Sequence, residues 1–532
     1  MKSSSKIDFA FDQEAEKLSK GLISVFSLEN ELCDNIQATL TETYRKEISA
    51  IMTRTALDWA EERAVMTAGG KIQLGVKAEV ETVYGRVTYD TYDVVDVFGK
   101  TRHSFAEGRS GLAKTVRFMM LLCEISSRTS FRSTADIMNL HRRPDDQLSA
   151  YTVHDIVIRL GKEVEEAKYR LARLILKFFS VAASRPCADA VDEPIVKCRE
   201  LDKSLDSEVE SAIQSVRFSV DIDEISKLPL PDWMAGEART EVEDAMKRVV
   251  SGPKGPDGKG SLIVSSDDVL VVMQPMTRPG DPEKGKRHYA TETVIHITQA
   301  VEAETEKWSY VICGKTLDRT MDMLKAFLLI SSLDNEIVFF TDGAANLRNA
   351  LFERFGKDIR LILDWFHLKK RVNESLSMGL KGSALRKEML KQLMQYLWHG
   401  RTRDACLIIS RIPDVKVKKS SELVGLVKYL AKQSPYIPDY YERRGYQLKN
   451  SSNAVECANN LLVSKRQKGS GMSWSKTGSG SMASIKALIM NNELESFLRY
   501  GDGAVSLCKP FSSPGEICYI NPSLANLMAK KT

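Results

Sequence analysis

The sequence lacks the cysteine patterns of a disulfide framework or a zinc ribbon. It contains nine cysteines, an odd number, scattered from Cys33 to Cys518, and none forms a C-x-x-C pair. Disulfide scaffolds and zinc ribbons both depend on regularly paired cysteines. We therefore expect a chain that folds without bridged cysteines, as is usual in a reducing cytoplasm.

Long apolar runs are missing as well. No stretch of about 18 uncharged apolar residues occurs, the length at which a membrane-spanning helix becomes a candidate. The first residues, Met1 to Asp8, are polar and lead into a charged amphipathic stretch, whereas a signal peptide needs an apolar core of about 7–15 residues. We expect neither a membrane segment nor a secretory leader.

A strong excess of one charge is also absent, because the net charge is only +5 over 532 residues. The distribution is uneven, however. Residues 357–420 hold 15 Lys and Arg against 6 Asp and Glu, a local charge of +9. One basic segment in a near-neutral chain predicts a local contact with a polyanion. The alternative is an ordinary solvated helical face.

The N-terminal part predicts helix, then strands. Apolar residues recur at helical spacing over 8–70, and residues 76–98 alternate as strands do, with a turn at Tyr84-Gly85-Arg86. Residues 113–162 predict three short helices, the second capped by Ser133 and the third beginning near Ser149.

The last two of these helices, joined by a polar turn, match a helix-turn-helix whose second helix could enter a major groove. The candidates for its exposed face are Tyr151, Thr152, His154 and Arg159. A plain three-helix packing unit is the alternative. The following residues, 185–260, have an irregular composition, with a Gly- and Pro-rich stretch over 251–260.

Beyond this region the pattern becomes α/β. Strands are predicted at 262–264, 269–273, 288–298, 308–313, 337–340 and 359–363, and helices at 317–332, 345–355, 367–435 and from about 453. Acidic residues follow two of the strands, as Asp267-Asp268 and Asp342, and Glu456 lies on the last helix. Strand–Asp, strand–Asp and a distant helix with Glu is the order of a ribonuclease H-like fold.

Carboxylates at strand ends suit metal-dependent phosphoryl transfer. Two Mg²⁺ ions about 4 Å apart can stabilise both the attacking and the leaving oxygen of an in-line displacement, and Mg²⁺ prefers oxygen ligands. Asp342 follows four apolar residues and precedes Gly343, which permits a sharp exit from the strand. The alternative for Asp342-Gly343 is an ordinary turn.

Six short motifs then add a family resemblance. They are Phe340-Thr-Asp-Gly-Ala344, Ile362-Leu-Asp-Trp-Phe-His-Leu368, Leu397-Trp-His-Gly400, Ser451-Ser-Asn-Ala-Val-Glu456, Arg466-Gln-Lys468 and Gly471-Met-Ser-Trp-Ser475. In this order they resemble bacterial insertion-sequence transposases of the three-carboxylate (DDE) type, in the Kra-type group, which is similar in plan to Mutator-like transposases. The resemblance runs over roughly residues 262–500 and is weak over 1–250.

The resemblance implies that Asp342 is the second catalytic and metal-binding carboxylate and Glu456 the third. For the first we favour Asp267, with Asp268 a close alternative and Asp221 a distant one. Alternation along a strand points Asp267 and Asp268 to opposite faces, so that only one of them can be a ligand. The implied cofactor is a pair of Mg²⁺ ions, for which Mn²⁺ can substitute.

The 114 residues between Asp342 and Glu456 are too many for a bare ribonuclease H fold, and the family inserts a helical domain there. We expect phosphate-directed DNA contacts from this insertion and from the segment after Glu456. The residues predicted to contact DNA are Asp364, His367, Lys369, Lys370, Arg371, Arg401, Arg403, Lys465, Arg466, Lys468 and Trp474, and Lys416–Lys419 is a further candidate segment.

Three of these predictions have alternatives. Asp364-x-x-His367 matches a family signature and could position the scissile strand or a flipped base, or it could only fix the start of the insertion helix. Trp474 could stack on a base or merely anchor its loop. Lys465 to Lys468 could bind phosphate or be ordinary helix C-terminal charge. His399 reads as structural.

The predicted fold class is α/β, a ribonuclease H-like core with an all-helical insertion, preceded by helical and helix-turn-helix segments. We divide the chain into a helical N-terminal segment with a small β region (1–110), a helix-turn-helix-like DNA-binding segment (111–184), an irregular linker region (185–260), the first part of the catalytic core (261–366), the helical insertion (367–448), the last part of the core with Glu456 (449–500) and a C-terminal tail (501–532).

The resemblance implies cleavage of transposon-end phosphodiesters and joining of the freed 3′-OH to target DNA. It also implies a homo-oligomer on DNA, since two ends must be joined, and a nucleoid-associated cytoplasmic location. One alternative is a decayed or repurposed DNA-binding protein on the same fold. Another is a zinc hydrolase using Asp364 and His367. Relatives often carry paired cysteines near the N-terminus, and the corresponding stretch Tyr92–Lys100 has none, which makes zinc doubtful.

Overall fold

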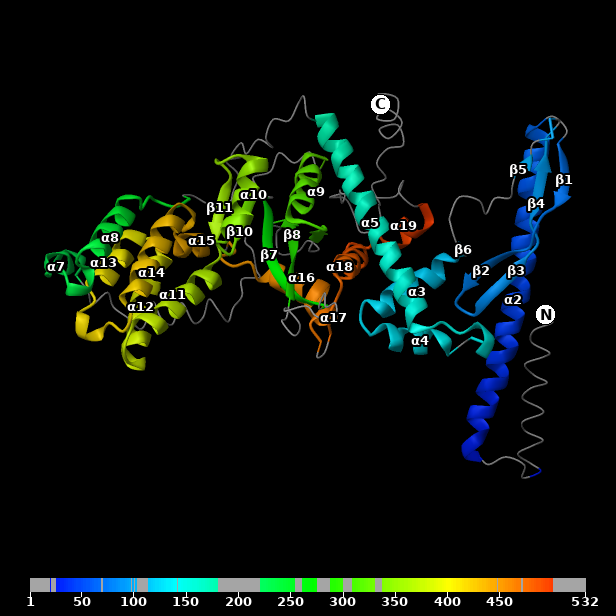
Figure 1. Cartoon of the computed structure of the whole chain (residues 1–532), viewed down its shortest axis with the longest axis horizontal. Helices are drawn as coiled ribbons and strands as arrows, with labels where there is room; N and C mark the ends of the chain where they lie inside the picture. The colour runs from blue at the N-terminus through cyan, green and yellow to red at the C-terminus, as the bar shows by residue number, and fades with distance from the viewer. Residues whose placement is uncertain are drawn as a thin grey trace, which may run out of the picture. The chain divides into compact units, whose positions relative to one another are not determined.

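The computed structural model describes residues 20, 25–67, 70–96, 98–99, 101–102, 113–140, 142–179, 221–253, 261–274, 288–299, 309–330, 337–446, 448–469 and 472–500. These residues form a mixed α/β protein (Figure 1). No helix among them is long and apolar enough to cross a membrane. The chain divides into an N-terminal unit, Met1–Leu160 with Leu494–Gly501, and a core unit, Gly161–Glu493 with Asp502–Thr532.

The N-terminal unit contains a long helix, α2 (Val25–Met66), and two small sheets. Their strands are β1 (Lys71–Leu74), β2 (Ala78–Thr82), β3 (Gly85–Tyr89), β4 (Tyr92–Val95), β5 (Thr101–Arg102) and β6 (Ala113–Lys114), in the orders β1-β4-β5 and β3-β2-β6. Buried Val80, Val87 and Tyr89 pack against Ile48 and Met52 of α2. The predicted helix and strands are thus present, although most of the helix predicted before residue 25 lies outside the described residues.

Three helices follow these sheets, α3 (Val116–Ser126), α4 (Phe131–Asn139) and α5 (Ala150–Phe179). The prediction that Ser133 caps the second helix is wrong, because the Ser130 side chain accepts the backbone N–H of Ser133 and starts α4 three residues earlier. Helix α5 begins next to Ser149 as predicted, and the Ser149 hydroxyl accepts the backbone N–H of Thr152, but α5 is 30 residues long rather than short. The four candidate contact residues Tyr151, Thr152, His154 and Arg159 are exposed, and DNA reading by them stays a prediction.

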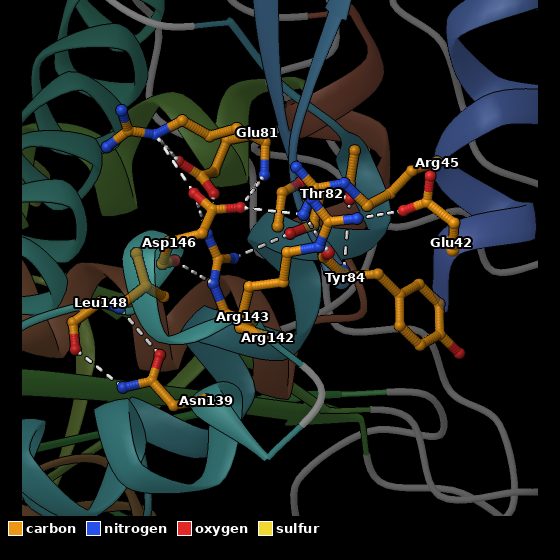
Figure 2. Close-up of polar contacts among 12 residues, drawn as sticks. Glu42, Arg45, Glu81, Thr82, Tyr84, Asn139, Arg142, Arg143, Asp146 and Leu148 are labelled. Atoms are coloured by element: carbon orange, nitrogen blue, oxygen red, sulfur yellow. Dashed lines mark hydrogen bonds and ion pairs between the residues drawn. The ribbon is translucent and has the colours of Figure 1, made fainter. Parts of the chain in front are cut away.

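A buried ion network ties the β2–β3 hairpin and α2 to the turn between α4 and α5 (Figure 2). Arg142, whose side chain is fully buried, donates to the carboxylate of Glu81 and, at 2.8 Å, to the backbone carbonyl of Asp146. The Asp146 carboxylate accepts the backbone N–H of Arg86 and lies 3.3 Å from the Arg45 guanidinium. We call Glu81, Asp146, Arg142, Arg86 and Arg45 the arginine-paired cluster.

The core unit is organised around a five-stranded sheet in the order β11-β10-β7-β8-β9. Its strands are β7 (Leu262–Met273), β8 (His288–Gln299), β9 (Ser309–Cys313), β10 (Ile337–Thr341) and β11 (Arg360–Leu363). Strand β8 runs antiparallel to both β7 and β9, whereas β10 runs parallel to β7 and β11 parallel to β10. The prediction of two short strands around Asp267-Asp268 is wrong. Strand β7 is continuous, because β8 pairs with it from Leu262 to Met273.

Helices cover both faces of this sheet. On one face, which we call the α10 side, α9 (Leu317–Ile330), α10 (Ala345–Phe355) and α5 pack on Leu262 and Val264 of β7. On the other, the insertion side, Ile263 and Phe340 contact the core of the helical insertion. Because side chains alternate along a strand, the odd-numbered residues of β7 and the even-numbered residues of β10 face the insertion side.

The segment predicted as the helical insertion is all helix, and we keep the name helical insertion for it. It consists of α11 (Trp365–Gly379), α12 (Ser383–Trp398), α13 (Thr402–Ser410), α14 (Ser420–Gln433) and α15 (Tyr440–Gly445). Trp365, Trp398 and Tyr440 are fully buried and pack ring against ring. The Tyr440 hydroxyl donates to the carbonyl of Leu363 at 2.7 Å, which fastens the end of the insertion to β11.

The prediction of an irregular region over 185–260 is wrong for its described part, 221–253. There, α7 (Ile222–Lys227) and α8 (Glu237–Lys247) pack against α13 and α14. The Asp414 carboxylate accepts two backbone N–H groups of the turn between them, from Asp232 at 2.9 Å and Trp233 at 2.7 Å. Neither helix gives a clear helical spacing of apolar residues in the sequence, because α7 has only 6 residues and α8 carries few large apolar ones. Residues 180–220 and 254–260 lie outside the described part.

Candidate active site

Strand β7 carries the two candidates for the first carboxylate on opposite faces of the sheet. Asp267 lies on the insertion side, where it accepts a hydrogen bond from the Asn459 amide at 2.6 Å. Asp268 lies on the α10 side and accepts hydrogen bonds from the Thr293 hydroxyl at 2.7 Å and from the Asn346 amide at 3.1 Å. Because the other acidic residues lie on the insertion side, the geometry favours Asp267.

Asp342 begins the turn that leaves β10. Phe340 is in register with Ser265 of β7, so continuing the parallel register brings Asp342 beside Asp267. One oxygen of Asp342, Oδ1, accepts the backbone N–H of Ala344 at 2.7 Å. Within the described residues no hydrogen bond engages the other oxygen, Oδ2. Gly343 has a φ of +91°, a conformation that a side chain disfavours.

Glu456 lies on α16 (Asn453–Asn459), which packs against β7 and β8. Glu456 and Asn459 are three residues apart and therefore share a helix face. The hydrogen bond from Asn459 to Asp267 shows that this face meets Asp267. The helix continues as a π-helical turn, Asn460–Ser464, and then as α17 (Lys465–Gln467). Such π-helical turns are frequent at functional sites.

Electrostatics place the three acidic residues in one neighbourhood. Burial raises the pKa of Asp267, and the charge of Asp342 raises it further. Burial also raises the pKa of Glu456, with further increases from the charges of Asp364 and Asp267. Opposing effects come from His367, which lowers both pKa values. The carboxylates therefore repel one another and favour a positive ligand between them.

Asp364 joins the first helix after β11 to the start of α16, at the two ends of the helical insertion. It is 1% exposed and caps α11 by accepting the backbone N–H of His367 at 2.9 Å. Its other oxygen accepts the backbone N–H of Ser452, the residue at which α16 begins. Because the N–H of Trp365 also donates to the carbonyl of Asn450 at 3.1 Å, the two ends of the insertion are held together here.

The His367 ring lies between this base and the acidic residues. Its Nδ1 is 3.2 Å from Asp364. Burial alone would lower the pKa of His367, but the hydrogen bond and charge of Asp364, together with the charges of Asp267 and Asp342, raise it on balance. Two roles were predicted for the Asp364–His367 pair, positioning DNA or fixing the start of the insertion helix. The contacts of Asp364 favour the second role for this residue. The role of His367 in positioning a DNA strand stays a prediction.

The donors that converge here fit magnesium better than zinc. Within the described residues, no group of three or more His, Cys, Asp or Glu side chains is arranged so that it could hold a metal ion by itself. Mg²⁺ is commonly held by one or two carboxylates and completes its coordination with water and substrate phosphates. The pKa of Asp267 is raised mainly by burial and to a smaller extent by the charge of Asp342, and a divalent cation bound here would favour the charged carboxylate. Asp364, by contrast, is occupied by backbone N–H groups on both oxygens, which disfavours a zinc site with His367.

Most residues predicted to contact DNA are accessible. Lys369 is half-buried. The exposed residues are Lys370, Arg371, Arg401, Arg403, Lys465 and Lys468, together with Lys416, Lys418 and Lys419 of the further candidate segment. Lys370 lies close enough to Glu456 for its charge to lower the pKa of that carboxyl. We call these accessible lysines and arginines the basic surface; within it, Arg401 and Lys419 also pair with Asp404 and Glu422.

Arg466 and Trp474 are placed differently, because both are buried. The Arg466 guanidinium lies 4.9 Å from the centre of the Trp474 ring. The Trp474 backbone pairs with β7, with its N–H donating to Val272 at 3.0 Å and its carbonyl accepting from Gln274 at 2.8 Å. Burial and pairing favour the alternative that Trp474 anchors its loop, and they leave Arg466 no open face for phosphate.

Sequence reasoning missed three polar residues that hold this site. They are Asn459 beside Asp267, and Tyr429 and Gln433 of α14 beside the Asp342-Gly343 turn. Burial raises the pKa of Tyr429, as do the charges of Asp342 and Asp364. No motif identifies them, although Asn459 follows Glu456 at a helical spacing. The distant candidate Asp221 is only the N-cap of α7, which packs on α13.

Comparison of the sequence with models of known protein families and with curated proteins gives no match.

Proposed function

We propose that this chain is a DDE-type transposase that cleaves transposon ends and joins them to target DNA. The observation that carries the proposal is the convergence of Asp267, Asp342 and Glu456 from two neighbouring strands and a distant helix. Their mutual charge effects are those of groups at one site. The six motifs that resemble insertion-sequence transposases supply the reaction class.

The proposed fold is ribonuclease H-like. Three antiparallel strands, β7 to β9, are followed by β10 and β11, which run parallel to β7 on its other side. The first carboxylate then comes from the first strand of the sheet, the second from the end of the fourth, and the third from a helix beyond the insertion. This order of strands and acidic residues supports the assignment.

In the proposed mechanism, the carboxylates of Asp267, Asp342 and Glu456 would hold the metal ions together with water and substrate phosphates. Bound Mg²⁺ would supply positive charge for the attacking and leaving oxygens of an in-line displacement. On balance burial raises the pKa of both Asp267 and Glu456. For Asp267, the backbone N–H of Asp268, the charge of His367 and the amide of Asn459 offset part of this rise, and His367 and Lys370 offset part of it for Glu456. The basic surface beside them would hold the DNA backbone.

The two reactions are phosphoryl transfers. In the first, a water oxygen bonds to phosphorus while the bond from phosphorus to the 3′ oxygen breaks, leaving a 3′-OH and a 5′-phosphate. In the second, this 3′ oxygen bonds to a target phosphorus, and the displaced target oxygen takes up a proton. No bond between protein and DNA is formed. Joining two ends requires a homo-oligomer on DNA, and we place the protein with the cytoplasmic nucleoid.

The test is cleavage of DNA that carries the element's ends, with Asp268→Asn as a control for Asp342→Asn. Asp342→Asn should reduce Mg²⁺-dependent cleavage and strand transfer by about 1,000-fold or more, because it removes several kcal/mol of metal-assisted stabilisation. DNA binding should persist. Asp268→Asn, on the other face of the sheet, should keep most of the activity. Wild-type activity in Asp342→Asn, or no cleavage by the wild type with any divalent ion, would overturn the proposal.

A further inference from the structure

The segments that carry the three acidic residues are each held by a polar contact from a distant part of the chain. Asn459 binds Asp267 across 192 residues of sequence, and Asp364 holds Ser452, at the start of the Glu456 helix, across 88. The third contact comes from the helical insertion. Gln433, the last residue of α14, donates from Nε2 to the carbonyl of Gly343 at 3.0 Å, across 90 residues.

Gln433 is held from both sides. It is 2% exposed, and its Oε1 accepts a hydrogen bond from Arg348 at 3.1 Å. Arg348 is itself buried, on the first turn of α10, with its guanidinium 5.4 Å from the centre of the Tyr436 ring. A buried amide that uses both of its ends in this way has a single orientation. The contact therefore joins α10, α14 and the turn after β10 into one unit.

The contacted turn is the one that orients Asp342. Asp342 Oδ1 is fixed by the Ala344 N–H, one residue beyond Gly343. Gly343 has a φ of +91°, and a Cβ built on it would lie 3.2 Å from both Gln433 and the Tyr429 hydroxyl. A glycine has several other conformations available. A contact that holds its carbonyl therefore restricts the direction of the neighbouring carboxylate.

We propose that Gln433 is a positioning residue through which the helical insertion sets the orientation of Asp342. The inference rests on the proposed function, because it concerns how the second carboxylate is presented to metal and phosphate. It gives the insertion a role inside the active site, in addition to any contact with DNA. Displacements of about 1 Å can reduce a rate by roughly 100-fold, so one hydrogen bond at this turn has a measurable effect.

The decisive variant is Gln433→Glu, which keeps the size of the side chain and its acceptor toward Arg348 but loses the N–H that Gly343 accepts. We expect cleavage to slow by roughly 10- to 100-fold, and the Mg²⁺ concentration for half-maximal rate to rise several-fold. DNA affinity should be unchanged. Gln433→Met, which removes both hydrogen bonds, should show the same changes, and it decides the question if Gln433→Glu does not fold.

Gln395→Glu is the matched control, since Gln395 is a buried glutamine of α12 in the same insertion. It makes the same change from amide to acid at a buried position of the insertion and should leave the Mg²⁺ dependence unchanged. A melting temperature that falls in the Gln433 variants with a wild-type rate and Mg²⁺ dependence would assign Gln433 a purely structural role. If Asp342→Asn is inactive but the Gln433 variants match the wild type, only this inference fails. If Asp342→Asn retains cleavage, the proposed function fails.

Discussion

The arginine-paired cluster and the candidate active site both bring buried acidic residues together, but they differ in what surrounds them. Glu81 and Asp146 are contacted by Arg142 and lie near Arg86 and Arg45. Among the described residues, no arginine or lysine forms an ion pair with Asp267 or Asp342, and Asp267 accepts hydrogen bonds from the Asn459 amide and the backbone N–H of Asp268.

The difference separates a structural cluster from a functional one. Buried charges that have partners and hydrogen bonds hold elements together, and here they fix a hairpin to a helical turn. Buried carboxylates without a cation repel one another, and the protein tolerates this where a ligand supplies the missing charge. Functional sites of this kind commonly lower the stability of the folded protein. The expectation is that substitutions will have opposite effects on stability in the two clusters.

The largest effect on stability should come from removing the cation of the arginine-paired cluster. Arg142→Met leaves two buried carboxylates with less compensation, and the free energy of unfolding should fall by about 3–5 kcal/mol. Urea unfolding of the full chain measures this loss. The neighbouring Arg143→Met breaks an exposed pair with Glu42 and should cost less than about 1 kcal/mol. Equal losses in the two variants would remove the distinction drawn here.

A smaller loss of stability should follow from placing a side chain in the turn after Asp342. Gly343→Ala combines a φ of +91° with a Cβ only 3.0 Å from Leu363, and we expect about 2 kcal/mol of destabilisation together with slower cleavage. Gly356 has a φ of +83° but no atom within 4 Å of a built Cβ. Gly356→Ala should therefore lose stability from the backbone alone and keep the wild-type cleavage rate.

In the candidate active site, by contrast, removing a charge should raise the stability of the protein. Without metal, Asp342→Asn removes a charge that raises the pKa of Asp267, and stability at neutral pH should rise by roughly 0.5–2 kcal/mol. A raised carboxyl pKa contributes stability at low pH that is lost as pH rises through it, so the advantage of the variant should shrink in acid. Thermal melts across pH, with and without Mg²⁺, test this. Mg²⁺ should stabilise the wild type more than the variant.

The sequence predicted the secondary structure around the site well because that signal is local. Apolar runs predicted the central strands, and Ala345–Phe355 was predicted as a helix with the bounds of α10. The motif that contains Asp364 and His367 was also found. What failed depended on partners distant in sequence. One example is β7, which is a single strand only because β8 pairs across Asp267-Asp268.

The contacts that hold the candidate site were beyond sequence reasoning for the same reason. Gln433 and Asn459 are ordinary polar residues until the fold brings them to Gly343 and Asp267. Trp474 could stack on DNA or pack in the interior, and only its pairing with β7 favours the second. Charge and spacing locate an acidic site, whereas the residues that orient it follow from tertiary structure.

The smallest expected effect is on DNA binding, and it compares a lysine without an ion pair with one that has an ion pair. Lys370 is exposed beside Glu456, and no ion pair among the described residues engages it, whereas Lys428 of the same insertion pairs with Glu241 at 2.9 Å. Lys370→Ala should weaken DNA binding slightly and lower the slope of log affinity against log salt by about one. Lys428→Ala should leave that slope unchanged, because its charge is already balanced by the protein. Titrations of DNA binding across KCl concentrations measure both slopes, and a loss of slope at Lys428 but not at Lys370 would show that the unpaired cations beside the acidic site do not mark the DNA path.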